Sequence, residues 1–243
     1  GRELATGLLK DGFGVVIADV DPDVGNKTVE ELSKDFGDKV IFAKTDVTKR
    51  GDVKAAVDAC RKAFGSINVM INNAGFNKPE PFLEASEEIW RAILEVNSLG
   101  VLIGIQEAAK AMIEDGVKGK IINTASIAGR SGFPDFAPYS ASKAAVISLT
   151  QSAGLNLIEH GINVNAIAPG VVDGEHWDGV DALFARYEGL KPGEKKKQVA
   201  ADVPYGRMGT ADDLTGMAIF LASPEADYIV AQTYNVDGGN WMS

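Results

Sequence analysis

Cysteine and histidine are scarce in this 243-residue chain. Cys60 is the only cysteine, and His160 and His176 are the only histidines. A single cysteine cannot form an intrachain disulfide, so we expect a reducing, cytoplasmic compartment. The two histidines lie 16 residues apart and belong to no Cys/His cluster, a spacing that does not suit metal ligands. The sequence therefore predicts neither a disulfide-stapled domain nor a metal site.

Long apolar runs, linkers and excess positive charge are also missing. No apolar run approaches the roughly 20 residues of a membrane span, and residue 1 begins no signal-peptide pattern. The net charge of −10 argues against a nucleic-acid or anionic-membrane surface. No Pro/Gly/Ser-rich linker or internal repeat divides the chain. With 45% hydrophobic residues, residues 1–243 should form one domain with a sizeable core.

Short apolar runs alternate with amphipathic stretches along the chain. Strands that alternate with helices indicate βαβ units, that is, a doubly wound parallel sheet covered by helices on both faces. The predicted strands are Val15–Ala18, Val40–Ala43, Ile67–Ile71, Lys120–Asn123, Val164–Ala168 and Tyr234–Val236. The predicted helices are Val24–Phe36, Gly51–Phe64, Ser86–Asn97, Gly100–Asp115, Tyr139–His160 and Ala211–Ala222.

Two segments depart from this alternation. Residues 173–205 are polar, glycine-punctuated and only partly helical, which is typical of a lid that follows a strand. The chain also opens at Gly1 directly in an amphipathic helical pattern, although a doubly wound fold should open with a strand and a glycine-rich turn. We therefore expect that first strand and turn to be missing from the given sequence.

The most informative motif is Tyr139-Ser-Ala-Ser-Lys143, with Ser126 thirteen residues upstream. Residues four apart share a helix face, and Pro138 suits a helix start. A lysine ammonium near a phenol stabilises the phenolate; lowering the tyrosine pKa by about three units takes roughly 4 kcal/mol. The pair could then act as a general acid/base on a hydroxyl or carbonyl. Taken alone, however, most Tyr-x-x-x-Lys motifs lie on solvent-exposed helix faces and have no catalytic role.

Other residues stand where a dinucleotide would bind at the ends of predicted strands. Asp19 could accept a hydrogen bond from a ribose hydroxyl and would repel a 2′-phosphate, which favours NAD over NADP; it could equally be an ordinary strand end or helix cap. Asp46 could accept from an adenine amino group or cap the next helix. Asn-Asn-Ala-Gly, residues 72–75, and Pro169-Gly170 would let the backbone approach a ligand closely, or would simply form tight turns.

These pieces, in this order and together with Asn97 and Asp237-Gly-Gly239, resemble the classical short-chain dehydrogenase/reductase family over essentially the whole chain. The resemblance implies a Rossmann-like fold, an NAD-dependent alcohol oxidoreductase activity and a homotetramer or homodimer. It also implies roles at matching positions. Tyr139 would be the acid/base, Lys143 would lower its pKa and bind the nicotinamide ribose, and Ser126 would hydrogen-bond the reacting oxygen. Asn97 would hold a water in a proton relay.

The resemblance implies a cofactor site at the strand ends as well. Its residues would be Gly1, Asp19, Asp46, Val47, Asn73, Ala74, Gly75, Tyr139, Lys143, Pro169, Gly170 and Val172. Only the last glycine of the family's phosphate-binding turn is present in the given sequence, as Gly1; a protein that lacked the rest would leave the pyrophosphate without its helix N-terminal cradle, so we expect a truncated sequence and not a native protein of this form. Gly174 stands where many relatives carry a threonine, which puts one contact to the nicotinamide carboxamide in doubt.

The two halves of the chain resemble dehydrogenases that act on different substrate classes. The carboxyl half, including the segment from Asn163 to Val180 and the ending Trp241-Met-Ser, looks like bacterial sorbitol (polyol) dehydrogenases; the stretches from Gly104 and Gly116 look like acetoin or 2,3-butanediol dehydrogenases. We favour the polyol. Its chain would meet Ser126 and four further residues, Arg130, Phe133, His176 and Trp177, although Trp177 could equally be a lid-packing residue. A catalytically silent NAD sensor is the distant alternative.

Overall fold

The computed structural model describes residues 1–242, without the side chains at 175, 176, 185 and 186. Its helices are α1 Arg2–Lys10, α2 Pro22–Phe36, α3 Arg50–Phe64, α4 Glu87–Leu94, α5 Gly100–Glu114, α6 Ala137–Leu157, α7 Glu175–Glu188, α8 Glu194–Asp202 and α9 Ala211–Ala222. Its strands are β1 Val15–Asp19, β2 Val40–Lys44, β3 Val69–Asn72, β4 Lys120–Thr124, β5 Asn163–Pro169 and β6 Thr233–Val236. Each strand predicted from the sequence is present, with ends shifted by at most two residues.

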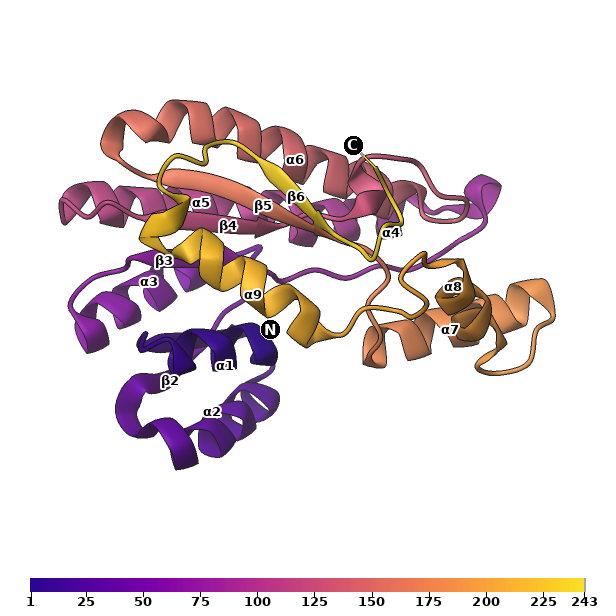
Figure 1. Ribbon diagram of the computed structural model, residues 1–243, viewed down its shortest axis with the longest axis horizontal. Coiled ribbons are helices and arrows are strands. Elements are labelled where there is room, and N and C mark those ends of the chain that lie inside the picture. The colour runs from indigo at the N-terminus through magenta and orange to yellow at the C-terminus, as the bar shows by residue number, and fades with distance from the viewer. Residues whose placement is uncertain (243) are drawn as a thin grey trace.

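All the strand pairs are parallel, and they form two sheets (Figure 1). One sheet pairs β1 with β2, and the other has the order β3-β4-β5-β6. Helices cover both faces: one apolar cluster includes residues of α3, α5 and α6, and another includes residues of α1 and α9. This is the doubly wound α/β architecture that the sequence predicts. Within the described residues, no strand joins β1 to β3.

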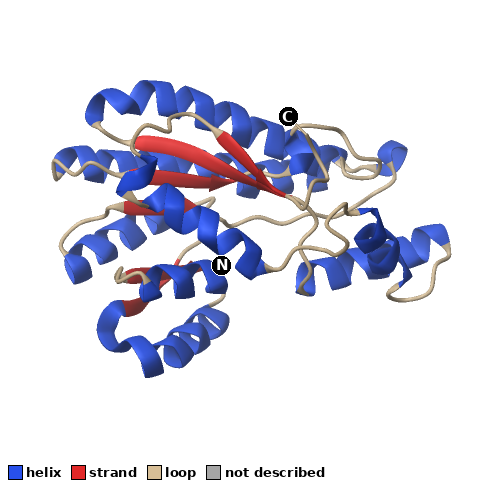
Figure 2. Cartoon of the chain, in the orientation of Figure 1, coloured by secondary structure: helices blue, strands red, loops and turns tan. Residues whose placement is uncertain are grey.

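The carboxyl ends of the strands lie on the side of the molecule where α7 and α8 project (Figure 2). Residues 173–205 do include two helices, α7 and α8, in agreement with the expected partly helical segment. A parallel bridge between Val172 and Gly209 closes its base. The loops after β3, β4 and β5 therefore meet at one edge of the larger sheet, next to this helical pair.

The helix expected over Ser86–Asn97 and the one expected over Gly100–Asp115 are continuous. A π-helical segment, η3 Glu95–Leu99, joins α4 to α5. By length and composition, Glu87–Glu114 could cross a membrane, which corrects the expectation that no run is long enough; 56% of its most apolar window is buried in the fold. Val101, Ile105 and Met112 of this run belong to the main core, as expected of a core helix.

Candidate active site

Tyr139 and Lys143 lie in the first two turns of α6, just after Pro138. The Lys143 ammonium lies 5.7 Å from the centre of the Tyr139 ring, and the Ser126 hydroxyl hydrogen-bonds the Tyr139 phenol. Ser126 follows β4 and begins the short turn η4 Ile127–Gly129, where its Oγ accepts from the Ala128 N–H. The structure therefore brings together the three residues that the sequence singled out from two separate segments.

Burial controls the electrostatics of this group. It raises the pKa of Tyr139, and the hydrogen bond with Ser126 lowers that pKa in turn. Burial also lowers the pKa of Lys143 from 10.5 to about 8. The ammonium donates to the Thr124 carbonyl at 2.6 Å. Desolvation of the phenolate is thus the largest effect on the Tyr139 pKa, and the lowering of that pKa by Lys143 stays a prediction.

Asn97 is fully buried in the π-helical segment η3, a rare geometry often found at functional sites. Its Oδ1 accepts from the Phe76 N–H at 3.0 Å, and its Nδ2 donates to the Phe76 carbonyl and to Ser142 Oγ. Both amide protons are thus used by protein groups. The water-holding role expected of Asn97 stays a prediction. The structure shows that the Asn97 amide hydrogen-bonds both the N–H and the carbonyl of Phe76.

Three groups that sequence reasoning missed hold this constellation. Ser142 Oγ donates to the Tyr139 carbonyl while accepting from Asn97. The Thr124 carbonyl fixes Lys143. Gly129 lies so close to α6 that a Cβ there would be 2.7 Å from the Lys143 carbonyl. Only Ser142, inside the Tyr-to-Lys motif, carried a readable signal.

The loop after β3 provides an open backbone surface beside Lys143. Asn73, Ala74 and Gly75 are exposed. A Cβ on Gly75 would lie 3.1 Å from Asn97 Oδ1 and 3.6 Å from Lys143 Nζ, and one on Gly1 would lie 3.5 Å from Asn73 Nδ2. Gly1 therefore lies beside Asn73, and Gly75 lies beside Asn97 and Lys143, on an exposed loop at the carboxyl edge of the sheet.

The acidic residues at the ends of β1 and β2 also face this edge. Asp19 Oδ1 accepts from the Asp21 N–H. Asp46 accepts from the N–H and the hydroxyl of Thr48, which holds the pKa of the Asp46 carboxyl below its usual range. Val47 packs against the first turn of α5, 2.9 Å from where a Gly100 Cβ would lie. Lys49, not Asp46, is the N-cap of α3.

At the end of β5, Gly170 is pressed against β6, with its N–H donating to the Val236 carbonyl. A Cβ on Gly170 would lie 2.8 Å from Asp237 Cα, so Pro169-Gly170 is a close-packed turn. Val172 then pairs with Gly209 at the base of the helical pair. Gly174 has φ 153° and is the N-cap of α7, a conformation in which a threonine would be strained.

The four further residues predicted to meet substrate lie in different settings. Arg130 binds Asn235 Oδ1 and the Thr233 carbonyl on β6. Phe133 is exposed in the loop before α6, and Trp177 is half-buried in α7. The side chain of His176 lies outside the described residues. Their contact with substrate stays a prediction.

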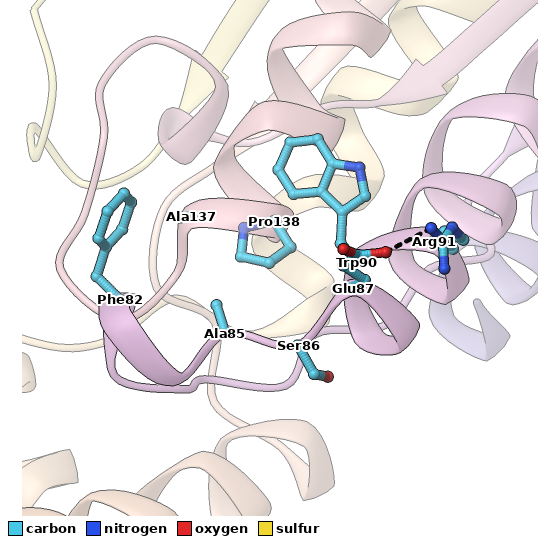
Figure 3. Close-up of a pocket in the computed structure, with 8 residues that line it drawn as sticks. All are labelled: Phe82, Ala85, Ser86, Glu87, Trp90, Arg91, Ala137 and Pro138. Carbon is cyan, nitrogen blue, oxygen red and sulfur yellow. Dashed lines mark hydrogen bonds and ion pairs between the residues drawn. The ribbon is translucent and has the colours of Figure 1, made fainter.

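Two cavities are found in the described structure, and Figure 3 shows the first of them. One, of about 540 Å³, adjoins the start of α6; in Figure 3, Phe82 and Trp90 lie on opposite sides of Pro138. The other, of about 370 Å³, lies at the base of α7 and α8, where Lys196 binds both Asp173 and Asp178. The predicted catalytic residues line neither of them.

The whole chain is similar to known oxidoreductases. A family model described as enoyl-(acyl carrier protein) reductase matches residues 1–240. Sorbitol dehydrogenase of Cereibacter sphaeroides is 55% identical over 243 residues, and galactitol 2-dehydrogenase of Agrobacterium fabrum is 49% identical; each match covers 100% of this chain and 93% of the relative. L-2,3-butanediol dehydrogenase of Corynebacterium glutamicum is 38% identical over 98% of this chain and 93% of its own length.

A solved structure is similar over nearly the same range. Sorbitol-6-phosphate 2-dehydrogenase from Erwinia amylovora has a TM-score of 0.94 at 29% identity, with 99% of this chain and 94% of that chain covered. Its fold therefore agrees with this chain from α1 to the carboxyl-terminal tail.

Proposed function

The chain belongs to the short-chain dehydrogenase/reductase family, and on that premise we propose that it is an NAD-dependent oxidoreductase that interconverts a secondary alcohol of a polyol and the corresponding ketose. The observation that carries the substrate class is the 55% identity to a sorbitol dehydrogenase over the whole chain. The 49% identity to a galactitol 2-dehydrogenase supports the same class. Sorbitol, galactitol and iditol are the polyols we expect.

We assign the chemistry to Ser126, Tyr139 and Lys143. Ser126 hydrogen-bonds the reacting oxygen, and Tyr139 takes the hydroxyl proton as the carbonyl forms. The nicotinamide, when bound, accepts the hydride from the same carbon. Lys143 places positive charge near the phenol and binds the nicotinamide ribose. Asn97 keeps the Phe76 backbone in place and is the expected holder of a relay water.

The open edge of the sheet fits a dinucleotide. We assign its nicotinamide end to Gly75, Gly170 and Val172 and its adenosine end to Asp19, Asp46 and Val47. The exposed backbone of residues 73–75, with Gly75 close to the Lys143 ammonium, is the feature that supports this placement. Asp19 is the basis for proposing NAD, since its carboxylate would repel a 2′-phosphate.

A substrate panel tests this function. We expect NADH formation with sorbitol, galactitol or iditol and NAD, with much lower turnover when NADP replaces NAD. The 38% identity to a 2,3-butanediol dehydrogenase supports the second candidate, oxidation of a small diol. Turnover of 2,3-butanediol with no activity on any polyol would overturn the polyol assignment. Cofactor binding without turnover of any alcohol would support the alternative that the chain is a catalytically silent NAD sensor.

We also propose a cytoplasmic, homo-oligomeric enzyme without nucleic-acid or membrane partners. The single cysteine, Cys60, supports the cytoplasmic compartment. The net charge of −10 supports the absence of nucleic-acid and anionic-membrane partners. The family resemblance supports the tetramer.

A further inference from the structure

Arg130 stands at the end of the short turn that begins with Ser126. Within this turn the Gly129 N–H donates to the Ser126 carbonyl and the Arg130 N–H donates to the Ile127 carbonyl, both at 2.9 Å. The turn is therefore a small hydrogen-bonded unit, so a displacement of Arg130 also displaces Ser126. The two ends of the turn move together unless these bonds break.

The Arg130 guanidinium is fastened to the last strand. Its Nε donates to Asn235 Oδ1 at 2.8 Å and its Nη2 donates to the Thr233 carbonyl at 2.6 Å. The side chain is half-buried, and among the described side chains no carboxylate lies within ion-pair distance of it. Two directed hydrogen bonds to one strand, made by the rigid guanidinium fork, fix its orientation more firmly than a single ion pair would.

Asn235 extends this attachment in two directions. Its backbone lies opposite Ala168 in the β5–β6 pair, and its Nδ2 donates to the Trp241 carbonyl at 2.9 Å. The amide is thus held by the sheet and by the tail, with its oxygen aimed at Arg130. On the other side of the turn, Gly129 rests directly on the α6 backbone at Lys143.

We propose that Arg130 and Asn235 are a positioning pair that holds the Ser126 hydroxyl against Tyr139, and that Arg130 does not bind the substrate. Gly129 sets the distance between the turn and α6, while the Arg130–Asn235 contact keeps the turn from rotating away. The inference deepens the proposed function and rests on it for the role of Ser126.

Loss of the pair has a defined chemical consequence. The hydrogen bond from Ser126 is the interaction that lowers the Tyr139 pKa against the effect of burial. If the turn moves away from α6, the bond between Ser126 and Tyr139 weakens and the pKa of Tyr139 rises. A smaller fraction of Tyr139 is then in the phenolate form at a given pH. The reacting oxygen also loses its Ser126 partner in the transition state, which lowers kcat more than it raises KM.

A double-mutant cycle measures this coupling. Arg130→Met, Arg130→Lys, Asn235→Ala and the Arg130→Met/Asn235→Ala pair are compared with wild type in polyol oxidation across pH. We expect Arg130→Met and Asn235→Ala each to lower kcat about 10-fold or more, with KM for the polyol changed less than about threefold. The double variant should be no worse than the poorer single variant. Arg130→Lys should recover part of kcat, since one of the two bonds can form.

Arg91→Met is the matched control. Arg91 lies on α4 and pairs with Glu87 at the surface, so its loss should leave kcat and the pH profile unchanged. The Arg130→Met and Asn235→Ala profiles should shift to higher pH, as that of Ser126→Ala does. A KM for the polyol that rises about 10-fold or more in Arg130→Met while Asn235→Ala stays normal would overturn the proposal and make Arg130 a substrate ligand.

A titration makes the test independent of turnover. The tyrosinate absorbance of Tyr139, identified as the signal lost in Tyr139→Phe, should appear at higher pH in Arg130→Met and Asn235→Ala than in wild type, and Ser126→Ala should show the same shift. Unshifted titration in both variants would contradict the positioning role, whichever alcohol the enzyme oxidises. A wild type that oxidises no alcohol would instead contradict the proposed function and leave this readout valid.

Discussion

At the scale of single residues, the site is dominated by the cost of burying charge. Lys143 and Tyr139 sit together on the first turns of α6, and burial works against the charged form of each. The Tyr-x-x-x-Lys spacing predicted that both would share one helix face, and they do. The spacing could not show how deeply they lie, because their burial depends on the contacts of α6 with η4 and η3, which lie outside the motif.

The raised pKa of Tyr139 predicts opposite pH dependences for the two directions of the reaction. Polyol oxidation needs the phenolate, so its kcat/KM should rise with pH through the alkaline range; ketose reduction needs the phenol, so it should fall there. The measurement is initial rates in both directions across pH with matched ionic strength. Oxidation that is fastest in acid would contradict the assignment of Tyr139 as the base.

Lys143 should decrease stability while it serves activity. Its pKa falls from 10.5 to about 8 on folding, so below pH 8 the folded state carries the full cost of a buried ammonium, about 3 kcal/mol. Between about pH 8 and 10.5 the unfolded chain holds more protons, so the free energy of unfolding gains this amount as pH rises.

The variant Lys143→Met should therefore raise Tm at pH 7. It removes the buried charge but leaves the Thr124 carbonyl without its donor, which costs about 1 kcal/mol, so the net gain is about 2 kcal/mol. For a chain of this length that corresponds to a rise of roughly 4–8 °C, measured by calorimetry at fixed protein concentration, with activity abolished. A lower Tm would show that the ammonium stabilises the fold.

At the scale of elements, the sequence predicted regular segments well and their junctions poorly. The strands, with their β-branched runs, appear where expected. The π-helical segment at Asn97 was not foreseen, because a one-residue change in helical pitch leaves the pattern of apolar residues almost intact. The contact of Arg130 with β6 was missed for a related reason: it joins residues about 100 positions apart, and no local pattern reports such a pairing.

The turn η4 should tolerate no side chain at Gly129. An alanine there would place Cβ 2.7 Å from the Lys143 carbonyl carbon and oxygen, so the turn must move off α6 and carry Ser126 with it. We expect Gly129→Ala to lower kcat about 10-fold or more and to destabilise the fold by about 1–3 kcal/mol.

Gly132→Ala is the control for this variant. It lies in the next loop, where a Cβ would meet nothing within 4 Å. Steady-state kinetics and thermal unfolding of both variants check the prediction. Equal activity in the two would show that the close approach at Gly129 is not needed for catalysis.

At the scale of the whole molecule, two parallel sheets bring every predicted strand-end residue to one edge. Parallel strands align their carboxyl ends, so the order of motifs along the chain was enough to predict that Asp19, Asn73, Ser126 and Gly170 would share it. The described strands divide into the pair β1-β2 and the sheet β3-β4-β5-β6. The packing of α7 against α8, which includes the ion pair of Lys196 with Asp178, could not be predicted from the sequence patterns.

Several large apolar side chains stay exposed on one copy of the chain, among them Trp90 and Leu155 on the outer helices and Tyr228 near β6. Together with the family resemblance, this exposure predicts a homotetramer. Light scattering should give about 100 kDa, four times the 25.7 kDa of one chain. A mass equal to one chain at micromolar concentration would contradict this assembly.

The central claim is that Tyr139 is the acid/base of an NAD-dependent polyol dehydrogenase. The most direct measurement compares NADH formation from sorbitol by wild type and Tyr139→Phe, together with NADH binding by both. The account predicts turnover by wild type, a loss of about 100- to 10,000-fold in Tyr139→Phe, and similar NADH affinity in the two proteins. Sorbitol oxidation that survives in Tyr139→Phe would contradict it.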